Sequence, residues 1–515
     1  MTFEIAFVLL SLLGMVIALI LDKMRPGMIL FSVVVLFLCA GILTPKEMLE
    51  GFSNKGMITV ALLFLVSEGI RQSGTLGQVI KKLLPQGKTT VFKAQLRILP
   101  SVAFISAFLN NTPVVVIFAP IIKHWAKSVK LPATKFLIPL SYVTILGGIC
   151  TLIGTSTNLV VHGMILEAGY EGFTMFELGK VGIFIAIAGI IYLFIFSKRL
   201  LPDARPDTAV PDEEVEEGEK LHRVEAVLGA RFPGINKKLK DFNFQRHYGA
   251  EVKEIKTRNG QRFVSNLEDV VLHEGDTLVV MADDTFIPTW GESSVFVLLT
   301  NGNEPDTTGK KKRWFALLLL VLMIVGATVG ELPVTKEMFP DIKLDMFFFV
   351  SITTIIMAWT NLFPARKYTK YISWDILITI ACAFAISKAM VNSGVADSVA
   401  KFIIGLSDDY GPHVLLAMLF IITNLFTELI TNNAAAALAF PLALSIASQL
   451  GVSPTPFFVV ICMAASASFS TPIGYQTNLI VQGIGNYKFT DFVRIGLPLN
   501  IITFLISIIL IPLIW

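Results

Sequence analysis

The stretch "GTSTNLVVHG" runs from Gly154 to Gly163 inside a long apolar segment, and "GYQTNLIVQG" runs from Gly474 to Gly483 inside another. The two stretches agree at six of ten positions and lie 320 residues apart. Each places a Thr-Asn pair where the surrounding sequence is hydrophobic. Backbone groups in hydrocarbon need hydrogen-bond partners, so polar residues there predict a helix that breaks where it lines a cavity. We therefore predict two broken helices related by an internal repeat.

The composition of the chain is that of a membrane protein. Of its 515 residues, 54% are hydrophobic and only 16% are charged, and the mean hydropathy is +0.70. We predict an all-α polytopic membrane protein with about ten transmembrane segments and two re-entrant hairpins. Each of the cysteines stands alone in a separate apolar run, which predicts small buried side chains: Cys39, Cys150, Cys382 and Cys462.

Residues 198–313 are of a different kind, because they hold nearly half of the charged residues of the chain. Alternating hydrophobic residues predict strands at 222–229 and 250–258, and Asn259-Gly260 predicts a hairpin turn. "EGDTLVVMADD", at 274–284, predicts a turn that leads into a further strand. The chain is thus divided into a first transmembrane repeat, a small α+β domain and a second repeat: residues 1–200, 219–292 and 313–515.

The two transmembrane parts match one another. Ser73-Gly74 recurs as Ser393-Gly394, and Asn111 recurs as Asn432, each asparagine nine residues before a proline. All these offsets are 320 or 321 residues. In each part, three apolar segments precede two apolar arms around a polar tip, and a broken segment and a final helix follow. Chance agreement of several landmarks at one offset is improbable, so we predict an internal repeat.

The paired arms, at 96–122 and 414–447, are predicted to be re-entrant hairpins. Each arm is expected to hold about 14 residues or fewer, too short to span ~30 Å at ~1.5 Å per residue. Most Lys and Arg residues of the short loops fall on one side if the N-terminus lies outside. We therefore predict a cell (inner) membrane protein with a cytoplasmic inserted domain. Because each half is predicted to cross the membrane five times, an odd number, the second half must be inverted relative to the first.

The hairpin tips and the helix breaks carry the candidate ligands. "SAFLNNTPVVV" places Ser106, Asn110, Asn111 and Thr112 at one tip, and "TELITNNAAAA" places Thr427, Thr431, Asn432 and Asn433 at the other. Each tip with its neighbouring break offers hydroxyl, amide and carbonyl oxygens without a carboxylate. Neutral oxygen shells suit Na⁺ and imply at least two cations, with an oxyanion between them. The alternative is that these polar residues only join helices by hydrogen bonds.

These motifs resemble those of the divalent-anion/sodium symporter family of the ion-transporter superfamily, over nearly all of the membrane part. "TPIGYQTNL" looks more like its sulfate branch than like its dicarboxylate carriers. The resemblance implies a sodium-coupled symporter of a divalent oxyanion, sulfate first, working as a homodimer by an elevator mechanism. It implies two sodium sites, on Ser106, Asn110, Asn111 and Gly154 and on Thr427, Asn432 and Gly474. It implies substrate contacts at Asn111, Thr112, Thr157, Asn158, Asn432, Asn433, Thr477 and Asn478.

The inserted domain resembles the TrkA C-terminal regulatory domain through "VEAVLG", "YGAEVKEI" and "EGDTLVVMADD". Such domains pair with one another and bind small regulatory ligands such as cyclic dinucleotides. The other expected partners are a small anionic substrate and membrane lipid, and no nucleic acid.

Other functions remain open from the sequence. A dicarboxylate carrier coupled to sodium or to protons is one alternative, with Glu428 as the proton carrier. Glu68, Lys388 and His162 are further polar candidates within apolar segments. A TrkA-regulated cation channel or uptake subunit is another alternative, although no T-V-G-Y-G filter is present. An enzyme is not indicated, because no catalytic triad, metal-ligand motif or phosphate loop is found.

Overall fold

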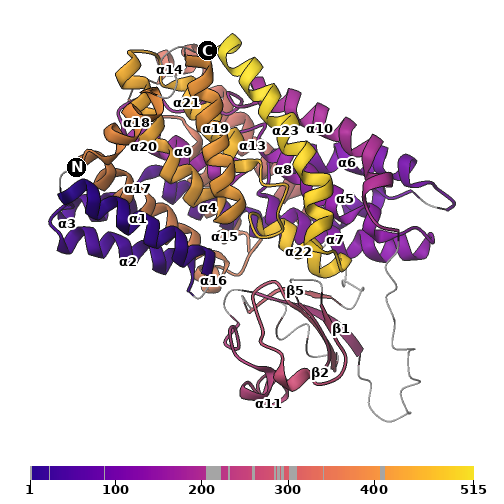
Figure 1. Cartoon of the computed structure of the whole chain (residues 1–515). Coiled ribbons are helices and arrows are strands. Elements are labelled where there is room, and N and C mark those ends of the chain that lie inside the picture. The colour runs from indigo at the N-terminus through magenta and orange to yellow at the C-terminus, as the bar shows by residue number, and fades with distance from the viewer. Residues whose placement is uncertain are drawn as a thin grey trace, which may run out of the picture.

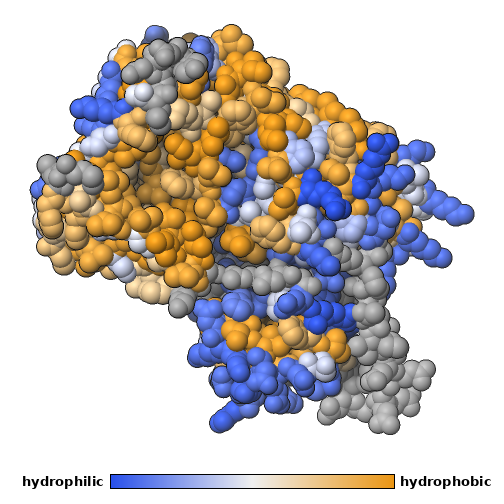
Figure 2. All heavy atoms as spheres, viewed as in Figure 1, coloured by the Kyte–Doolittle hydropathy of each residue, from blue (hydrophilic) through white to orange (hydrophobic). Residues whose placement is uncertain are grey.

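The computed structural model describes the chain except for residues 1–2, 22–23, 86, 204–221, 230–231, 258–260, 284–285, 287–289, 291–294, 301–309, 340 and 406–411. Its described part consists of a large helical body with a small sheet domain against one face (Figure 1). The visible surface of the helical body is mostly hydrophobic, whereas that of the sheet domain is largely hydrophilic (Figure 2). The helical body is therefore suited to lipid and the sheet domain to water.

The first part of the helical body precedes the sheet domain. Its α-helices are α1 (Phe3–Leu21), α2 (Pro26–Cys39), α3 (Pro45–Glu50), α4 (Lys55–Gln72), α5 (Thr75–Leu83), α6 (Val91–Ser106), α7 (Asn111–Ser128), α8 (Leu137–Gly148), α9 (Ser156–Glu167) and α10 (Gly179–Leu200). Helix ends have local causes. Asn54 caps α4 by accepting a hydrogen bond of 2.7 Å from Gly56 N. Gly74, with a φ of 69°, follows α4 in the left-handed region and separates it from α5.

The second part follows the sheet domain. Its α-helices are α13 (Lys310–Gly330), α14 (Pro333–Met338), α15 (Met346–Trp359), α16 (Tyr368–Tyr371), α17 (Trp374–Asn392), α18 (Val395–Gly405), α19 (Pro412–Leu429), α20 (Asn432–Leu450), α21 (Thr455–Ser466), α22 (Gln476–Gly485) and α23 (Phe489–Ile514). Among the described residues, 7 helices are long and apolar enough to cross a membrane, and five shorter apolar helices accompany them. The chain is thus a multi-pass membrane protein, and the number of ten segments stays a prediction.

The outer face of α10 shows how the helical body meets its surroundings. Ile183, Ile187 and Ile191 recur every fourth residue and are each about half exposed (50–53%). The same spacing of exposed Leu and Ile side chains recurs on α23. Residues four apart share one face of a helix, so each helix presents a continuous apolar stripe outward. Such stripes are stable against lipid chains and unfavourable in water.

The hairpin arms differ from their predicted length. The arms α6, α7, α19 and α20 contain 16, 18, 18 and 19 residues, so the predicted limit of about 14 residues is wrong. The prediction counted only residues 96–122 and 414–447, but α6 begins at Val91 and α7 ends at Ser128, and Pro100, Pro120 and Pro441 lie inside α6, α7 and α20. The neighbouring turns continue the helices past them. The arms alone therefore do not decide whether the hairpins are re-entrant, and that path stays a prediction.

The sheet domain contains a five-stranded antiparallel sheet in the order β3-β2-β4-β1-β5. Its elements are β1 (His222–Leu228), α11 (Phe244–Tyr248), β2 (Glu251–Lys256), β3 (Arg262–Phe263), β4 (Thr277–Ala282) and β5 (Phe296–Thr300). The three predicted strands are confirmed in β1, β2 and β4. The predicted turn at Asn259-Gly260 lies outside the described residues, but β2 and β3 on either side of it pair antiparallel. The edge strand β5 lies beyond residue 292, the predicted end of this domain.

Candidate functional site

Four helices of the body begin at the residues that the sequence motifs single out. The helices α7 and α20 start at the two tips, and α9 and α22 start at the two breaks. The helix α7 packs against α22, and α20 packs against α9, so each tip lies beside the break of the other half. The first N–H groups of a helix lack partners within the helix, and the helix dipole adds partial positive charge there. The arrangement therefore gathers hydrogen-bond donors suited to an anion.

The first tip is joined to the second break. Ser106 Oγ donates a hydrogen bond of 2.8 Å to Asn111 Oδ1, and both residues are completely buried. Asn111 Nδ2 donates in turn to the phenol oxygen of Tyr475 at 2.7 Å. The same phenol oxygen lies 2.8 Å from Thr155 Oγ1 at the first break. Tyr475 thus connects the first tip with both breaks, a role that the sequence analysis did not assign to it.

The second tip is joined to the first break in the same crosswise manner. Asn432 Nδ2 donates to Thr157 Oγ1 at 2.8 Å. Thr157 Oγ1 and Ser156 Oγ both donate to Asn433 Oδ1 at 3.2 Å. On the opposite side, Thr112 Oγ1 lies 3.4 Å from Gln476 Oε1. Asn432 and Asn433 of the second tip are therefore brought together with Thr157, whereas Thr112 of the first tip lies beside the second break.

The motif asparagines of the breaks, Asn158 and Asn478, have a different environment. Asn158 Nδ2 donates to the carbonyls of Thr151, at 2.9 Å, and Gly148, at 3.4 Å. Asn478 Nδ2 donates to the carbonyls of Ser468, at 2.9 Å, and Thr471, at 3.1 Å. These carbonyls belong to the ends of α8 and to the unwound segments after α8 and α21, so the amides satisfy groups that the breaks set free. Their donors are thereby engaged within the protein.

Thr477, the remaining predicted substrate residue, is completely buried beside α8. Ser141 Oγ of α8 lies 2.8 Å from Thr477 Oγ1 and 2.7 Å from Asn478 Oδ1. Ser141 was not among the predicted site residues, because it lies inside an apolar run and not at a tip or a break. The start of α22 is therefore held against α8, and not only against α7.

The first predicted cation shell is compact around Asn111. A Cβ atom on Gly148 would lie 2.7 Å from Asn111 Oδ1, and one on Gly154 would lie 2.5 Å from the Gly148 carbonyl oxygen. Both contacts are too close for a side chain, so glycine is required where these oxygens approach each other. Ser106, Asn111 and Gly154 are thus brought together as predicted. The oxygens of this cluster are hydroxyl, amide and carbonyl groups, the neutral ligands that suit Na⁺.

A carboxyl group lies beside the second predicted cation shell. Thr427 Oγ1 donates to the Ala465 carbonyl at 2.6 Å, and a Cβ on Gly474 would lie 2.5 Å from the Thr427 carbonyl oxygen. Ser468 Oγ lies 3.3 Å from that carbonyl oxygen and 3.5 Å from Glu428 Oε2. A carboxyl group therefore lies beside the predicted ligands of this half, and the ligand set itself stays a prediction. Sequence spacing placed Glu428 beside Thr427 but not its carboxylate against the break.

Glu428 is held in place by the unwound segment after α21. The backbone N–H groups of Ser470 and Thr471 each donate to its carboxylate at 2.8 Å. Asn500 Nδ2 of α23 donates to it at 2.7 Å. Three donors satisfy the charged form of a carboxylate away from water. Glu428 therefore fixes the second break and places its carboxyl group beside the second shell.

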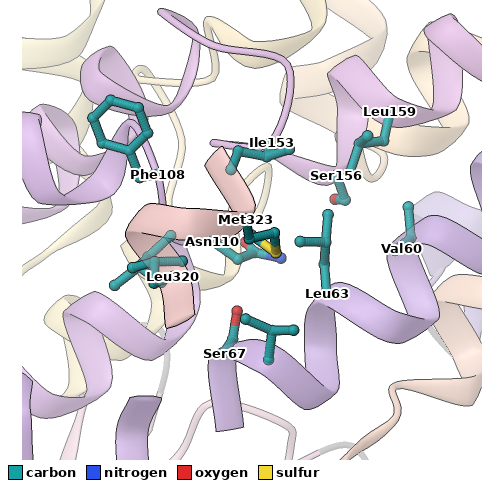
Figure 3. A pocket seen from close by; sticks show the side chains of 12 residues that line it. Val60, Leu63, Ser67, Phe108, Asn110, Ile153, Ser156, Leu159, Leu320 and Met323 are labelled. Atoms are coloured by element: carbon teal, nitrogen blue, oxygen red, sulfur yellow. The ribbon is translucent and has the colours of Figure 1, made fainter. Parts of the chain in front are cut away.

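Asn110, also predicted for the first shell, lines a pocket on the side of the tip that faces α4 and α13 (Figure 3). Ser156 and Ser67 line the same pocket, with Leu320 and Met323 of α13 on its apolar wall. Figure 3 shows these side chains around one space between the first tip, the first break and α4. The polar face of the site is thus bordered by an apolar surface from the other helices.

Comparison with known proteins identifies the family of this chain. The family model described as citrate transporter matches residues 16–450 and 342–515 of the chain. The chain belongs to the citrate transporter family. The family model and the relatives described below are transporters, so the chain is a transporter and not an enzyme. This agrees with the ion-transporter superfamily that the motifs indicated, whereas the finer divalent-anion/sodium symporter assignment is not shown.

Relatives of this transporter point to more than one substrate. It is 30% identical to a protein of Synechocystis named an uncharacterized transporter, over 94% of this chain and 92% of that one. It is 33% identical to a probable sodium/sulfate cotransporter of Chlamydomonas reinhardtii, over 54% of this chain and 31% of that one. It is 29% identical to a Na⁺/citrate cotransporter of Rattus norvegicus, over 25% of this chain and 23% of that one.

Of the other polar candidates, Glu68 has local hydrogen-bond partners. Arg71 and Gln72 of the same helix each donate to the Glu68 carboxylate, at 2.6–2.8 Å. The ring of His162 packs closely against Gly172, because a Cβ atom added to Gly172 would lie 2.3 Å from that ring. Among the described residues, no group of three His, Cys, Asp or Glu side chains forms a candidate metal site. These side chains lie outside the cluster at the tips and breaks.

Proposed function

We propose that the protein is a sodium-coupled symporter of a divalent oxyanion, sulfate first. The observation that carries this proposal is the crosswise junction of four helix starts. Among the described residues, the hydrogen-bond partners at both tips are hydroxyl, phenol and amide groups, and none of these partners is a lysine or an arginine. An anion bound there has its charge offset by helix N-termini and by cations that bind with it. Coupling to a cation follows from this chemistry.

Two sodium sites are proposed, one beside each tip. The first uses Ser106, Asn111 and the backbone near Gly154, and the second uses Thr427, Asn432 and the backbone near Gly474. Close oxygen packing at Gly148 and Gly154 supports the first, because it leaves only small neutral ligands around Asn111. The carboxylate of Glu428 supports a cation at the second, because a buried negative charge is stabilised by a cation.

The arrangement in the membrane is part of the proposal. The helices α7, α9, α20 and α22 start at positions that obey the offset of the sequence repeat, which supports two inverted halves. The Lys and Arg residues of the short loops support a cytoplasmic sheet domain, and the protein is proposed to lie in the cell (inner) membrane. Alternating access would move the helices of the tips and breaks against the remainder, in an elevator-type motion of each subunit of a homodimer. The sheet domain is proposed to be TrkA C-terminal-like, with a cyclic dinucleotide as its ligand.

A dicarboxylate carrier is the second candidate, and one observation favours it specifically. Glu428 lies within reach of the second cation shell, where a carboxylate able to take up a proton is expected for proton coupling. The sodium/citrate relative adds a carboxylate substrate to the family. Sulfate remains first because sodium/sulfate relatives match about twice as much of this chain, 54% against 25%.

Uptake by purified protein in liposomes separates these functions. Labelled sulfate, citrate and succinate are each offered under inward gradients of sodium, potassium or protons. The proposal expects sulfate uptake that requires the sodium gradient. Uptake of citrate or succinate instead would establish the second candidate, and a proton requirement would assign the coupling to Glu428. Potassium flux without any of these anions would contradict both and favour the channel.

A further inference from the structure

The sheet domain rests on the two helices that carry the first tip and the second break. Figure 1 shows β1 and β5 next to the ends of α7 and α22. A Cβ on Gly483 of α22 would lie 2.5 Å from Thr277 Oγ1 of β4. A Cβ on Gly275 would lie 3.6 Å from Leu479 Cβ of α22. The domain is therefore packed against α22 within a few residues of the binding motif, at Thr477 and Asn478.

An ion pair fastens the domain to α7. Lys123 Nζ of α7 lies 3.1 Å from both carboxylate oxygens of Glu225 on β1. Lys256 Nζ of β2 lies 3.4 Å from the same carboxylate. Burial of Glu225 disfavours its charged form, but the two lysines and Arg223 outweigh burial and lower its pKa to about 2. The carboxylate is thus ionised at physiological pH and pairs with α7 throughout that range.

The repeat shows what the domain displaces. Gly163 of α9 is the repeat counterpart of Gly483, and it packs on the start of α4 and on one side chain of α17. A Cβ on Gly163 would lie 2.7 Å from Asn54 Oδ1, 3.2 Å from Phe384 Cζ and 3.3 Å from Gly56 Cα. The counterpart of α4 is α17, at the offset of 320. In the place where α9 contacts α4, α22 instead contacts the sheet domain.

Inverted repeats explain why this exchange bears on transport. Alternating access in such carriers moves one repeat or bundle against the other around a fixed site, and we infer that the two halves exchange their contacts between the two access states. The contact of α9 with α4 in one state then becomes a contact of α22 with α17 in the other. The residues of α17 that correspond to Asn54 and Gly56 are Trp374 and Ile376. Gly483 cannot pack on Thr277 and on the start of α17 at the same time.

We propose that the sheet domain is an autoinhibitory clamp, which holds the Gly483 face of α22 and thereby prevents the contact of α22 with α17. This proposal rests on the alternating-access function proposed above, and it states how that same site is regulated. Undocking of the domain would free α7 and α22 together, because the Lys123–Glu225 pair and the Thr277–Gly483 contact belong to one interface.

A disulfide tests whether undocking is required. The Cβ of Thr277 lies 3.8 Å from the Cβ position of Gly483, which is the mean separation across a disulfide. T277C/G483C is made in a background in which the native cysteines are replaced by alanine. The sulfate uptake rate of the oxidised protein is expected to be at least tenfold lower than that of the reduced protein, and reduction should restore it. The single variants T277C and G483C are each expected to transport at the same rate before and after the same oxidation, because neither can form the cross-link. Absence of the disulfide, or full uptake by the cross-linked protein, would overturn the clamp.

Charge reversal tests the opposite direction. K123E and E225K should each raise the uptake rate roughly two- to fivefold, the population shift expected from a partly exposed ion pair. The double variant K123E/E225K should return the rate to that of the parent. K127E is the matched control, because Lys127 lies one turn along the same helix with an exposed side chain. A lower or unchanged rate in K123E would contradict the clamp, and K123Q provides the same test with a smaller change.

A second cross-link gives a readout that needs no substrate. I376C/G483C should form a disulfide more readily when K123E is also present than when Lys123 is kept. If the parent protein fails to take up sulfate but this cross-link still depends on K123E, the proposed substrate is wrong and the clamp stands. If sulfate is transported but the cross-link is indifferent to K123E, the clamp is wrong and the proposed function stands.

Discussion

Asn111 and Tyr475 lie 364 positions apart in the chain, yet the amide of Asn111 donates a hydrogen bond of 2.7 Å to the Tyr475 phenol oxygen. The bond crosses from the tip of one half to the break of the other. Both side chains are buried, so neither group has water as an alternative partner. A change at one tip is therefore felt at the opposite break, which is the coupling that a binding site shared by two halves requires.

Tyr475→Phe should lower uptake while the protein stays folded. The change removes one hydroxyl that serves both Asn111 and Thr155. An unpaired buried donor costs about 1–3 kcal/mol, which is roughly 5- to 150-fold in binding. Uptake against substrate concentration measures the effect. Tyr170→Phe is the control, because Tyr170 is 43% exposed. Equal uptake in the two variants would show that the Tyr475 hydroxyl is dispensable.

Asn111→Ala and Asn432→Ala should each abolish measurable uptake. Each amide joins a tip to the opposite break, and its oxygen is proposed to contact a cation. Size-exclusion profiles and thermal unfolding in detergent, compared with the parent, show that loss of uptake is not loss of folding. Uptake at the parent rate in both variants would refute the site.

Ser106→Ala and Thr427→Ala should raise the sodium concentration for half-maximal uptake without abolishing transport. Each removes one oxygen among several, so the cation site weakens but keeps its other ligands. Thr423→Ala is the matched control for the second site, because Thr423 lies one turn earlier on α19 and donates to its own helix at Leu419. Sodium dependence identical to the control in both variants would assign these hydroxyls to helix packing.

Glu428→Gln should also raise the sodium requirement, and by more than Thr427→Ala. Glutamine keeps the shape of the side chain but removes the charge, and it presents one oxygen to the donors of Ser470, Thr471 and Asn500. Uptake is measured over a range of sodium concentrations at two pH values. If the sodium dependence is unchanged but the variant loses a pH dependence that the parent shows, Glu428 carries protons, as the proton-coupled alternative requires.

Gly154→Ala should stop transport, because the new Cβ would lie 2.5 Å from the Gly148 carbonyl oxygen. That oxygen belongs to the backbone and cannot rotate away, so the first cation shell must open. Gly14→Ala is the control, since no atom lies within 4 Å of its new Cβ. Uptake and sodium dependence are compared for the two. Normal transport by Gly154→Ala would place the first cation elsewhere.

Much of this architecture follows from local sequence. The starts of α9 and α22 were predictable because a Thr-Asn pair close to a glycine in an apolar run, repeated in both halves, is typical of a helix break that lines a cavity. The strands β1, β2 and β4 were predictable because alternation places every second side chain in a core. Arm lengths were not, because α6 and α7 extend into the polar flanks of their apolar runs, to Val91 and Ser128, where hydrophobicity does not mark the helix end.

The crosswise partners and the place of Glu428 depend on how distant segments pack. Nothing near Asn432 in the chain indicates Thr157, whose hydroxyl oxygen is 2.8 Å from its amide nitrogen and 275 positions away. The same holds for Thr277 and Gly483, which meet only because the inserted domain folds against α22. Sequence patterns report the backbone preferences and burial of each segment. Which buried surfaces come together is a property of the complete set of helices, since each is stable only when its polar and apolar faces find partners at once.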